Sequence, residues 1–172
     1  FLDIGTGVAQ LPMAVKERFP DADVWGIDVG APMLRYGHMR AAENGLDINL
    51  AQRLAEDSGF EDNSFDVVTA YILFHEVPTE DTKKILAEVR RILRPGGVFF
   101  PVDFKTYTQS QPSASGRFNQ WWDHVHNNEV WTEEYRDSDF IQLMADAGLT
   151  VNENAPTLQQ RFWNSVMATK PA

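Results

Sequence analysis

Short apolar segments alternate with longer amphipathic segments over residues 1–104 of this chain. The apolar segments have the length and the β-branched and aromatic content of strands, and they cover residues 1–4, 22–28, 48–52, 64–72 and 98–104. Helical spacing of apolar residues occurs between them, in residues 9–19, 31–45 and 79–93. Because parallel strands need a crossover that a helix usually supplies, the alternation predicts an α/β fold with a mostly parallel sheet covered on both faces.

The pattern changes after residue 104. A polar loop, "TYTQSQPSASG", leads into "RFNQWWDHVHNNEVW", which is rich in tryptophan and histidine. Residues 138–148 then return to helical spacing, and "LTVNENA" and "QQRFWNSVMAT" are typical of a closing pair of strands. At 172 residues the chain has the size of one domain. We therefore expect a single domain over residues 1–172, with residues 105–136 as an insertion.

The composition argues against several classes of partner. With 15 basic and 25 acidic residues the net charge is −10, which makes nucleic acid a poor partner. Apolar runs fall short of the ~18 residues that a membrane-spanning helix needs, so we expect no membrane association. Cysteine is absent, which excludes disulfides and fits a reducing compartment, so we expect a cytoplasmic protein. The sequence does not decide the oligomeric state, and a homodimer stays open as an alternative.

A glycine turn follows the first predicted strand. Gly5 and Gly7 stand directly after it, and Asp28 ends the second predicted strand about 20 residues on. In a parallel sheet these positions meet at the carboxyl edge, where glycine lets a ligand approach the backbone and a carboxylate accepts the hydroxyls of a ribose. Asp28 alone is equally able to cap a turn, but its offset from the glycines favours ribose binding. The constellation therefore predicts a nucleoside-binding site.

Two nucleoside cofactors compete for this site. A dinucleotide fingerprint needs a third glycine at position 10, where the chain has Gln10, and this counts against NAD. Asp3 precedes the first glycine by two residues and is suited to hold a cationic amino group, although an acid there can also serve only to shape the loop. This favours a nucleoside attached to an amino acid.

The chain resembles the class I S-adenosylmethionine-dependent methyltransferases over nearly its whole length. "LDIGTGVA" resembles the first motif of that family, "VWGIDVGAPML" its ribose-binding second strand, "EDNSFDVVTAYILFHEVP" its fourth strand, and "ILRPGGVFFPVD" the turn and strand that follow. The resemblance implies a Rossmann-like three-layer sandwich with strand order 3-2-1-4-5-7-6 and an antiparallel strand 7. It also implies that helices normally preceding the first strand are missing from this catalytic domain, so that the chain is N-terminally truncated.

The resemblance assigns roles to named residues. S-adenosylmethionine is the implied cofactor, and the implied activity is methyl transfer by direct displacement to O, N or C of a small-molecule acceptor. The chain departs from the family at Leu54, where the family often has an acid that accepts a hydrogen bond from the adenine amino group. Either Glu56 or Asp57 takes the place of that acid, or packing and backbone contacts alone hold the adenine. The implied cofactor-binding residues are Asp3, Gly5, Gly7, Asp28, Val29, Met33, Ala55 and Tyr71.

Acceptor-side residues follow the fourth strand and lie in the insertion. His75 and Glu76 stand where the family meets its acceptor and are the predicted catalytic residues, the alternative being a hydrogen-bonded loop pair. The insertion is either a pocket wall or an ordinary amphipathic helix, and its predicted substrate-binding residues are Trp122, His126, Asn128 and Trp131.

We expect no metal, because His124 and His126 fall on different helical faces. Two rival functions remain, namely a non-catalytic S-adenosylmethionine-binding module and an NAD(P)-linked reductase.

Overall fold

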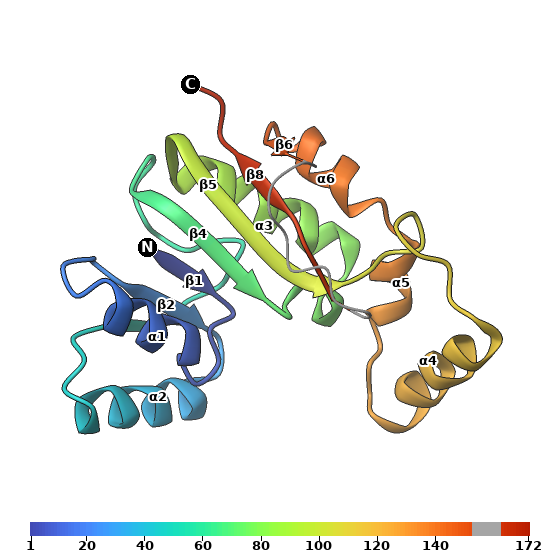
Figure 1. Ribbon diagram of the computed structural model, residues 1–172, viewed down its shortest axis with the longest axis horizontal. Helices are drawn as coiled ribbons and strands as arrows, with labels where there is room; N and C mark the ends of the chain where they lie inside the picture. The colour runs from blue at the N-terminus through green and yellow to red at the C-terminus, as the bar shows by residue number, and fades with distance from the viewer. Residues whose placement is uncertain (153–162) are drawn as a thin grey trace.

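A mixed sheet runs through the computed structural model of the chain, which describes residues 1–152 and 163–172 (Figure 1). Its strands follow the order β3-β2-β1-β4-β5-β8-β6, and β7 also pairs with β5. Strands β1 to β5 are mutually parallel, whereas β7 and β8 run antiparallel to β5. The strands are β1 (Leu2–Ile4), β2 (Trp25–Asp28), β3 (Asn49–Gln52), β4 (Phe65–Tyr71), β5 (Leu93–Phe104), β6 (Thr150–Asn152), β7 (Trp163–Ser165) and β8 (Met167–Thr169).

This order confirms the predicted 3-2-1-4-5-7-6 arrangement. The predicted seventh strand is present as β7 and β8, which are separated at Val166 and both lie against β5. Its antiparallel direction is also as predicted. Part of the predicted closing pair, residues 153–162, lies outside the described residues.

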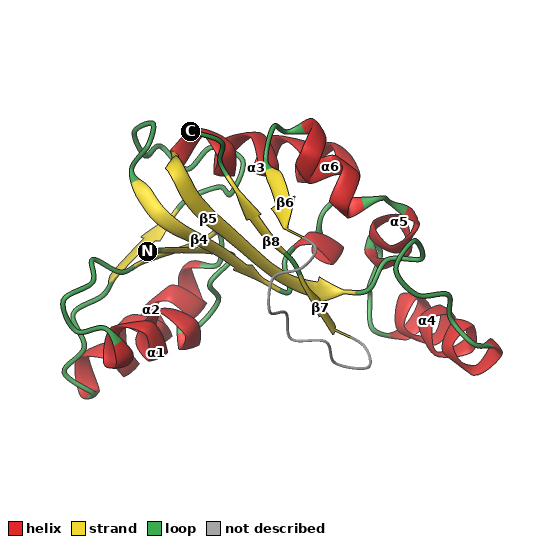
Figure 2. Ribbon diagram, turned by 45° about the horizontal axis from the view of Figure 1, so that its top comes forward, coloured by secondary structure: helices red, strands yellow, loops and turns green. Residues whose placement is uncertain are grey.

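Helices cover both faces of the sheet (Figure 2). Helices α1 and α2 lie on one face, over a small core that contains Val24, Ala41 and Ile48. Helices α3 and α6 lie on the other face, where the larger core gathers most of the buried aliphatic and aromatic side chains. The helices are α1 (Gln10–Arg18), α2 (Ala31–Glu43), α3 (Thr79–Ile92), α4 (Ala114–His126), α5 (Thr132–Asp137) and α6 (Phe140–Asp146), with a short 3₁₀ helix, η1 (Phe74–Glu76).

Helix α3 shows how the sequence specifies this packing. Its face toward the sheet carries Ile85, Leu86, Val89 and Ile92, all at most 1% exposed. Acids occupy its first turn and arginines its last, which matches the helix dipole. In the part of the chain that the structure describes, no helix has both the length and the apolarity needed to cross a membrane.

Two local predictions differ from the structure. The "RPGG" segment was expected to be a turn between helix and strand, but β5 begins at Leu93 directly after α3 and carries this segment as an irregularity in its pairing with β4. On the other side of β5, the Gly96 N–H donates to the Lys170 carbonyl and the Lys170 N–H donates to the Gly97 carbonyl, so this segment is held next to the end of β8. Helix α5 was not predicted, since six residues are too few for a clear helical period.

Candidate functional site

The turn after β1 combines two glycines in the left-handed region. Gly5 has φ of 67° and Gly7 has φ of 55°, which only glycine adopts without strain. A Cβ atom on Gly7 would meet no other atom within 4 Å, whereas one on Gly5 would lie 2.9 Å from Leu73 Cδ1. The space beside Gly7 is therefore open to a ligand. The space beside Gly5 is filled by the side chain of Leu73, which follows β4.

Asp28 connects this turn to the start of helix α2. Its Oδ2 accepts the backbone N–H of Gly7 at 2.8 Å, and its Oδ1 accepts that of Gly30 at 2.7 Å. The carboxylate is only 8% exposed and is held by both bonds. Each carboxylate oxygen retains a second lone pair, so the turn-capping role observed here leaves capacity for ribose hydroxyls.

Large apolar side chains are exposed at the carboxyl ends of β2 and β4 and in the loop that follows β3. Val29 is 61% exposed, Met33 44%, Leu54 48% and Tyr71 50%. Ala55 is half-buried and packs against the larger core. Apolar surface beside an open glycine turn and an oriented carboxylate suits a planar, partly apolar base attached to a sugar. The residues present therefore fit a nucleoside cofactor.

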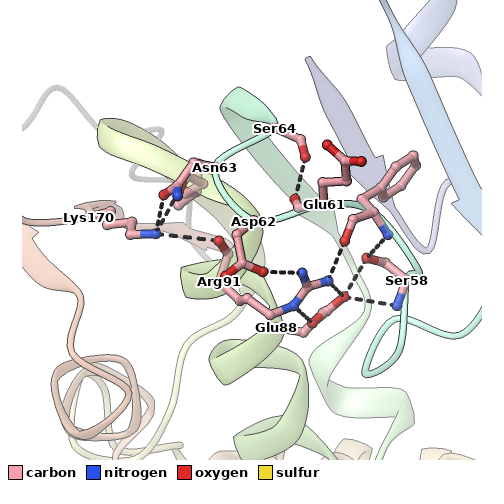
Figure 3. Close-up of polar contacts among 10 residues, drawn as sticks. Ser58, Glu61, Asp62, Asn63, Ser64, Glu88, Arg91 and Lys170 are labelled. Atoms are coloured by element: carbon pink, nitrogen blue, oxygen red, sulfur yellow. Dashed lines mark hydrogen bonds and ion pairs between the residues drawn. The ribbon is translucent and has the colours of Figure 1, made fainter.

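The loop between β3 and β4, which carries Leu54 and Ala55, is anchored to helix α3 (Figure 3). The Ser58 hydroxyl and backbone N–H both donate to Glu88, and Arg91 donates two hydrogen bonds to the same carboxylate. Arg91 also binds Asp62 at 2.6 Å. Burial alone would raise the pKa of Glu88, but the bonds from Arg91 and Ser58 outweigh it and lower the pKa. This network holds the loop against α3 at Ser58, four residues after the exposed Leu54.

Asp3 is buried in β1, where it is 2% exposed. Its carboxylate accepts the Thr69 hydroxyl from β4 at 2.7 Å. Burial raises the pKa of Asp3 to about 6, although hydroxyl groups of Thr69 and Thr6 lower it in part. The carboxylate thus binds the neighbouring strand in the structure and is poorly stabilised as an anion.

This raised pKa predicts that Asp3 makes the chain less stable as the pH rises. The folded chain keeps the Asp3 proton up to about pH 6, whereas an unperturbed Asp loses it near pH 3.8. The stabilisation that comes from this proton is therefore complete below pH 3.8 and is lost as the pH rises to about 6. We expect Asp3→Asn, which can still accept from Thr69, to lose less unfolding free energy than the wild type over this interval, by about 1.4 kcal/mol per unit of raised pKa. Urea denaturation at a series of pH values measures this, and parallel stability curves for the two proteins would contradict it.

The chain leaves β4 through a strained turn. Ile72 has φ of 59°, an unfavourable value for a β-branched residue, and its N–H donates to Val102 of β5. This turn places Leu73 beside Gly5 and starts η1. Strain of this kind persists where the surrounding structure holds it and is common at functional sites.

His75 in η1 pairs with Asp103 near the end of β5. Its Nδ1 lies 2.8 Å from Asp103 Oδ1, and the two residues are 3% and 2% exposed. Asp103 also accepts the backbone N–H groups of Phe74 and Phe104. Burial alone would lower the pKa of His75, but the bond to Asp103 and the charges of Asp103, Glu76 and Glu129 together raise it.

Glu129 joins this cluster from the segment between α4 and α5. Its Oε2 lies 3.9 Å from His75 Nε2, and Glu76 Oε1 lies 3.4 Å from the same nitrogen. The predicted catalytic residues His75 and Glu76 are therefore together, at the carboxyl edge of the sheet. Because β1 and β4 are parallel neighbours and Leu73 lies beside Gly5, this cluster is on the same edge as the glycine turn.

The predicted substrate-binding residues lie at and beyond the C-terminal end of α4, which projects from the rest of the fold (Figure 1). Trp122 is 48% exposed and its ring lies 4.0 Å from that of His126. Trp131 precedes α5 and is 38% exposed, and Asn128 has φ of 59°. Trp122 and His126 thus lie in α4, and Asn128 and Trp131 lie in the segment after it that carries Glu129.

Three residues of the site have no counterpart among the predicted ones. Asp103 and Glu129 approach His75, and Glu88 holds the loop of Ala55 through Ser58. A signal for Asp103 was present, because it is an acid near the carboxyl end of a predicted strand, where ligands bind in such sheets. Glu129 lies in the polar and aromatic insertion that is predicted to border the acceptor, although it is not among the residues chosen there. Glu88 carries no such signal.

Residues 1–97 match the methyltransferase domain family. A curated relative, the demethylmenaquinone methyltransferase of Thermus thermophilus, is 36% identical over 103 residues, which are 60% of this chain and 46% of that protein. The chain thus matches less than half of that relative's length.

Solved structures share the fold. A SAM-dependent methyltransferase from Methanosarcina mazei superposes with a TM-score of 0.77 at 20% identity, covering 99% of this chain and 91% of that chain. Phosphoethanolamine N-methyltransferase 2 of Haemonchus contortus, in complex with S-adenosyl-L-methionine, superposes with a TM-score of 0.73 at 20% identity, covering 99% and 48%. At this level of identity the likeness concerns the fold alone.

Proposed function

This chain belongs to the methyltransferase domain family, and we propose that it transfers the methyl group of S-adenosylmethionine to a small-molecule acceptor. The cofactor of this family is S-adenosylmethionine, which the Haemonchus structure contains. The observation that carries the proposal is the pairing of an open glycine turn at Gly7 with the carboxylate of Asp28. A sulfonium is already a good leaving group, so the protein need only align the reactants and exclude water.

The cofactor lies, in this proposal, along the carboxyl edge of β1 and β2. Its ribose binds the free lone pairs of Asp28, and its adenine packs on Val29 and Met33 with Leu54 and Ala55 at its border. The uncovered apolar surface of Val29, Met33 and Leu54 supports this placement. The amino acid end passes Gly7 toward Asp3 and Tyr71. Binding of the cationic amino group would offset the cost of ionising Asp3.

The acceptor lies, in this proposal, between η1 and the insertion at residues 105–136. His75 and Glu76 contact its nucleophilic group, and Trp122, His126, Asn128 and Trp131 border it. Aromatic side chains with few polar groups suit a planar, mostly apolar molecule. The Thermus relative is named for such an acceptor, demethylmenaquinone, and we propose a planar acceptor of the same chemical kind.

The test has two arms, binding and turnover. We expect calorimetry to detect binding of S-adenosylmethionine and S-adenosylhomocysteine and no binding of NADH. Incubation with methyl-labelled S-adenosylmethionine and a panel of planar hydroxylated acceptors should then transfer the label. Binding of NADH alone would replace the proposal with a reductase, and cofactor binding without transfer to any acceptor would favour a binding module.

Gly7→Ala tests the cofactor site with a matched control. Gly7 and Gly45 both have positive φ and open space where a Cβ would lie, but Gly45 follows α2, away from the carboxyl edge. Both alanine variants should lose about 1 kcal/mol of stability from left-handed strain. Only Gly7→Ala places a methyl group against the cofactor, and we expect about tenfold weaker binding of S-adenosylmethionine. Equal affinities in the two variants would remove Gly7 from the site.

A further inference from the structure

One side-chain cluster has the composition of a metal site. His75 Nε2, a carboxylate oxygen of Glu76 and one of Glu129 all lie within 4.8 Å of one another. The three residues come from η1 and from the segment between α4 and α5, which are 53 residues apart at Glu76 and Glu129. One imidazole nitrogen and two carboxylates are ligands that borderline divalent cations accept.

Asp103 sets the orientation of the His75 ring from the side opposite to the two glutamates. Its Nδ1 faces Asp103 Oδ1 at 2.8 Å, and that carboxylate is itself held by the N–H groups of Phe74 and Phe104. A carboxylate at Nδ1 places the imidazole proton on that nitrogen and leaves the lone pair on Nε2. This arrangement of carboxylate, histidine and open nitrogen is how proteins orient a metal-binding imidazole.

The other ring nitrogen of His75, Nε2, faces two carboxylates. The His75 side chain is 4% exposed, and among the described residues the groups near its Nε2 are Glu76 at 3.4 Å and Glu129 at 3.9 Å. A neutral imidazole with its buried lone pair directed at two carboxylates is unfavourable. A proton on Nε2 relieves this contact, and so does a divalent cation, which also accepts both carboxylates as ligands. Glu76 is the most exposed of the three, with 57% of its side chain accessible, so it can adjust to a bound ion and leave a coordination position for water or another ligand.

We propose that His75, Glu76 and Glu129 bind one divalent transition-metal ion, with Asp103 as the positioning residue behind His75. Zn²⁺ and Mn²⁺ both suit a site with one nitrogen and two oxygen ligands, whereas Mg²⁺ prefers oxygen ligands and water. This step rests on the proposed function and changes one part of it: with the metal bound, His75 and Glu76 act on the acceptor through the ion. The open coordination position would take an oxygen atom of the acceptor, which commits that acceptor to a hydroxyl or carbonyl group next to its methylated atom.

Metal binding is measured without cofactor or acceptor. ZnCl₂, MnCl₂ and MgCl₂ are titrated by calorimetry into the metal-free full chain, and bound Mn²⁺ is followed by electron paramagnetic resonance. We expect one Zn²⁺ per chain, weaker Mn²⁺ and still weaker Mg²⁺. Glu76→Gln and Glu129→Gln should each weaken Zn²⁺ binding at least about tenfold, and Asp103→Asn about 10- to 100-fold although it removes no ligand.

Glu80→Gln is the matched control. It removes the same charge from an exposed position of α3 where the carboxylate pairs with Lys83, and Zn²⁺ binding should stay unchanged. Absence of Zn²⁺ binding, or binding that survives in the Glu76→Gln, Glu129→Gln double variant and disappears in His126→Ala, would overturn the proposal. Because S-adenosylmethionine is absent from this measurement, failure here leaves the cofactor titration intact, and failure of that titration leaves the metal result intact.

Discussion

Asp28→Ala is expected to weaken the binding of S-adenosylmethionine by about 1.5–3 kcal/mol, or roughly 10- to 150-fold. Two causes combine in this loss. A charge-assisted acceptor for the ribose hydroxyls disappears, and the backbone N–H groups of Gly7 and Gly30 lose the carboxylate that orients them. Calorimetric titration of the folded variant measures the effect.

Asp21→Ala separates this local effect from a change in net charge. Asp21 is exposed in the segment between α1 and β2, so its removal changes the charge of the chain equally without touching the glycine turn. We expect the dissociation constant of this control to stay within about twofold of the wild type, since distant surface charges are screened. A dissociation constant for Asp28→Ala that equals the control would remove Asp28 from the ribose site.

Phe74→Ala is expected to lower the free energy of unfolding by about 3–5 kcal/mol. Phe74 is fully buried in η1, where its ring lies 4.7 Å from Phe140 of α6 and 6.2 Å from Phe99 of β5. The residue next to it is His75, so the same side chain that anchors η1 in the core also positions the cluster. Urea denaturation measures the loss.

Phe118→Ala deletes the same side chain from α4, where it is 57% exposed, and should change stability by no more than about 0.5 kcal/mol. If Phe74→Ala fails to fold, Phe74→Leu supplies the measurement, with an expected loss of about 1–2 kcal/mol from partial loss of packing. Similar losses in the variants at the two positions would show that η1 is not anchored by the core.

The sheet and the glycine turn could be predicted because they depend on local patterns. Strands with apolar runs, helices with an apolar face and glycines at a strand end are each visible within a few residues. The family resemblance then ordered the strands, and the structure confirmed that order. The distance from Asp28 to the glycines predicts ribose binding, which stays a prediction, and the structure shows the Asp28 carboxylate bound to the backbone of Gly7.

Contacts between distant side chains could not be predicted in the same way. Asp103 pairs with a histidine 28 positions earlier, and Ser58 pairs with a glutamate 30 positions later. Sequence spacing does not specify such pairs, because they depend on which strand ends meet and on how a loop lies over a helix. The strained backbone at Ile72 is another case, since Val102 of the neighbouring strand holds it there.

The sequence by itself determined the α/β class, and it predicted the candidate site at the carboxyl edge of the sheet with His75 and Glu76 among its residues. Only the tertiary structure decided that Asp103 stands behind His75, that Glu129 closes the cluster and that Leu73 fills the space beside Gly5. The physical reason is that periodic burial and turn chemistry act between near neighbours in the chain. Charge, hydrogen bonding and packing at a site act between atoms that meet only when the sheet has assembled.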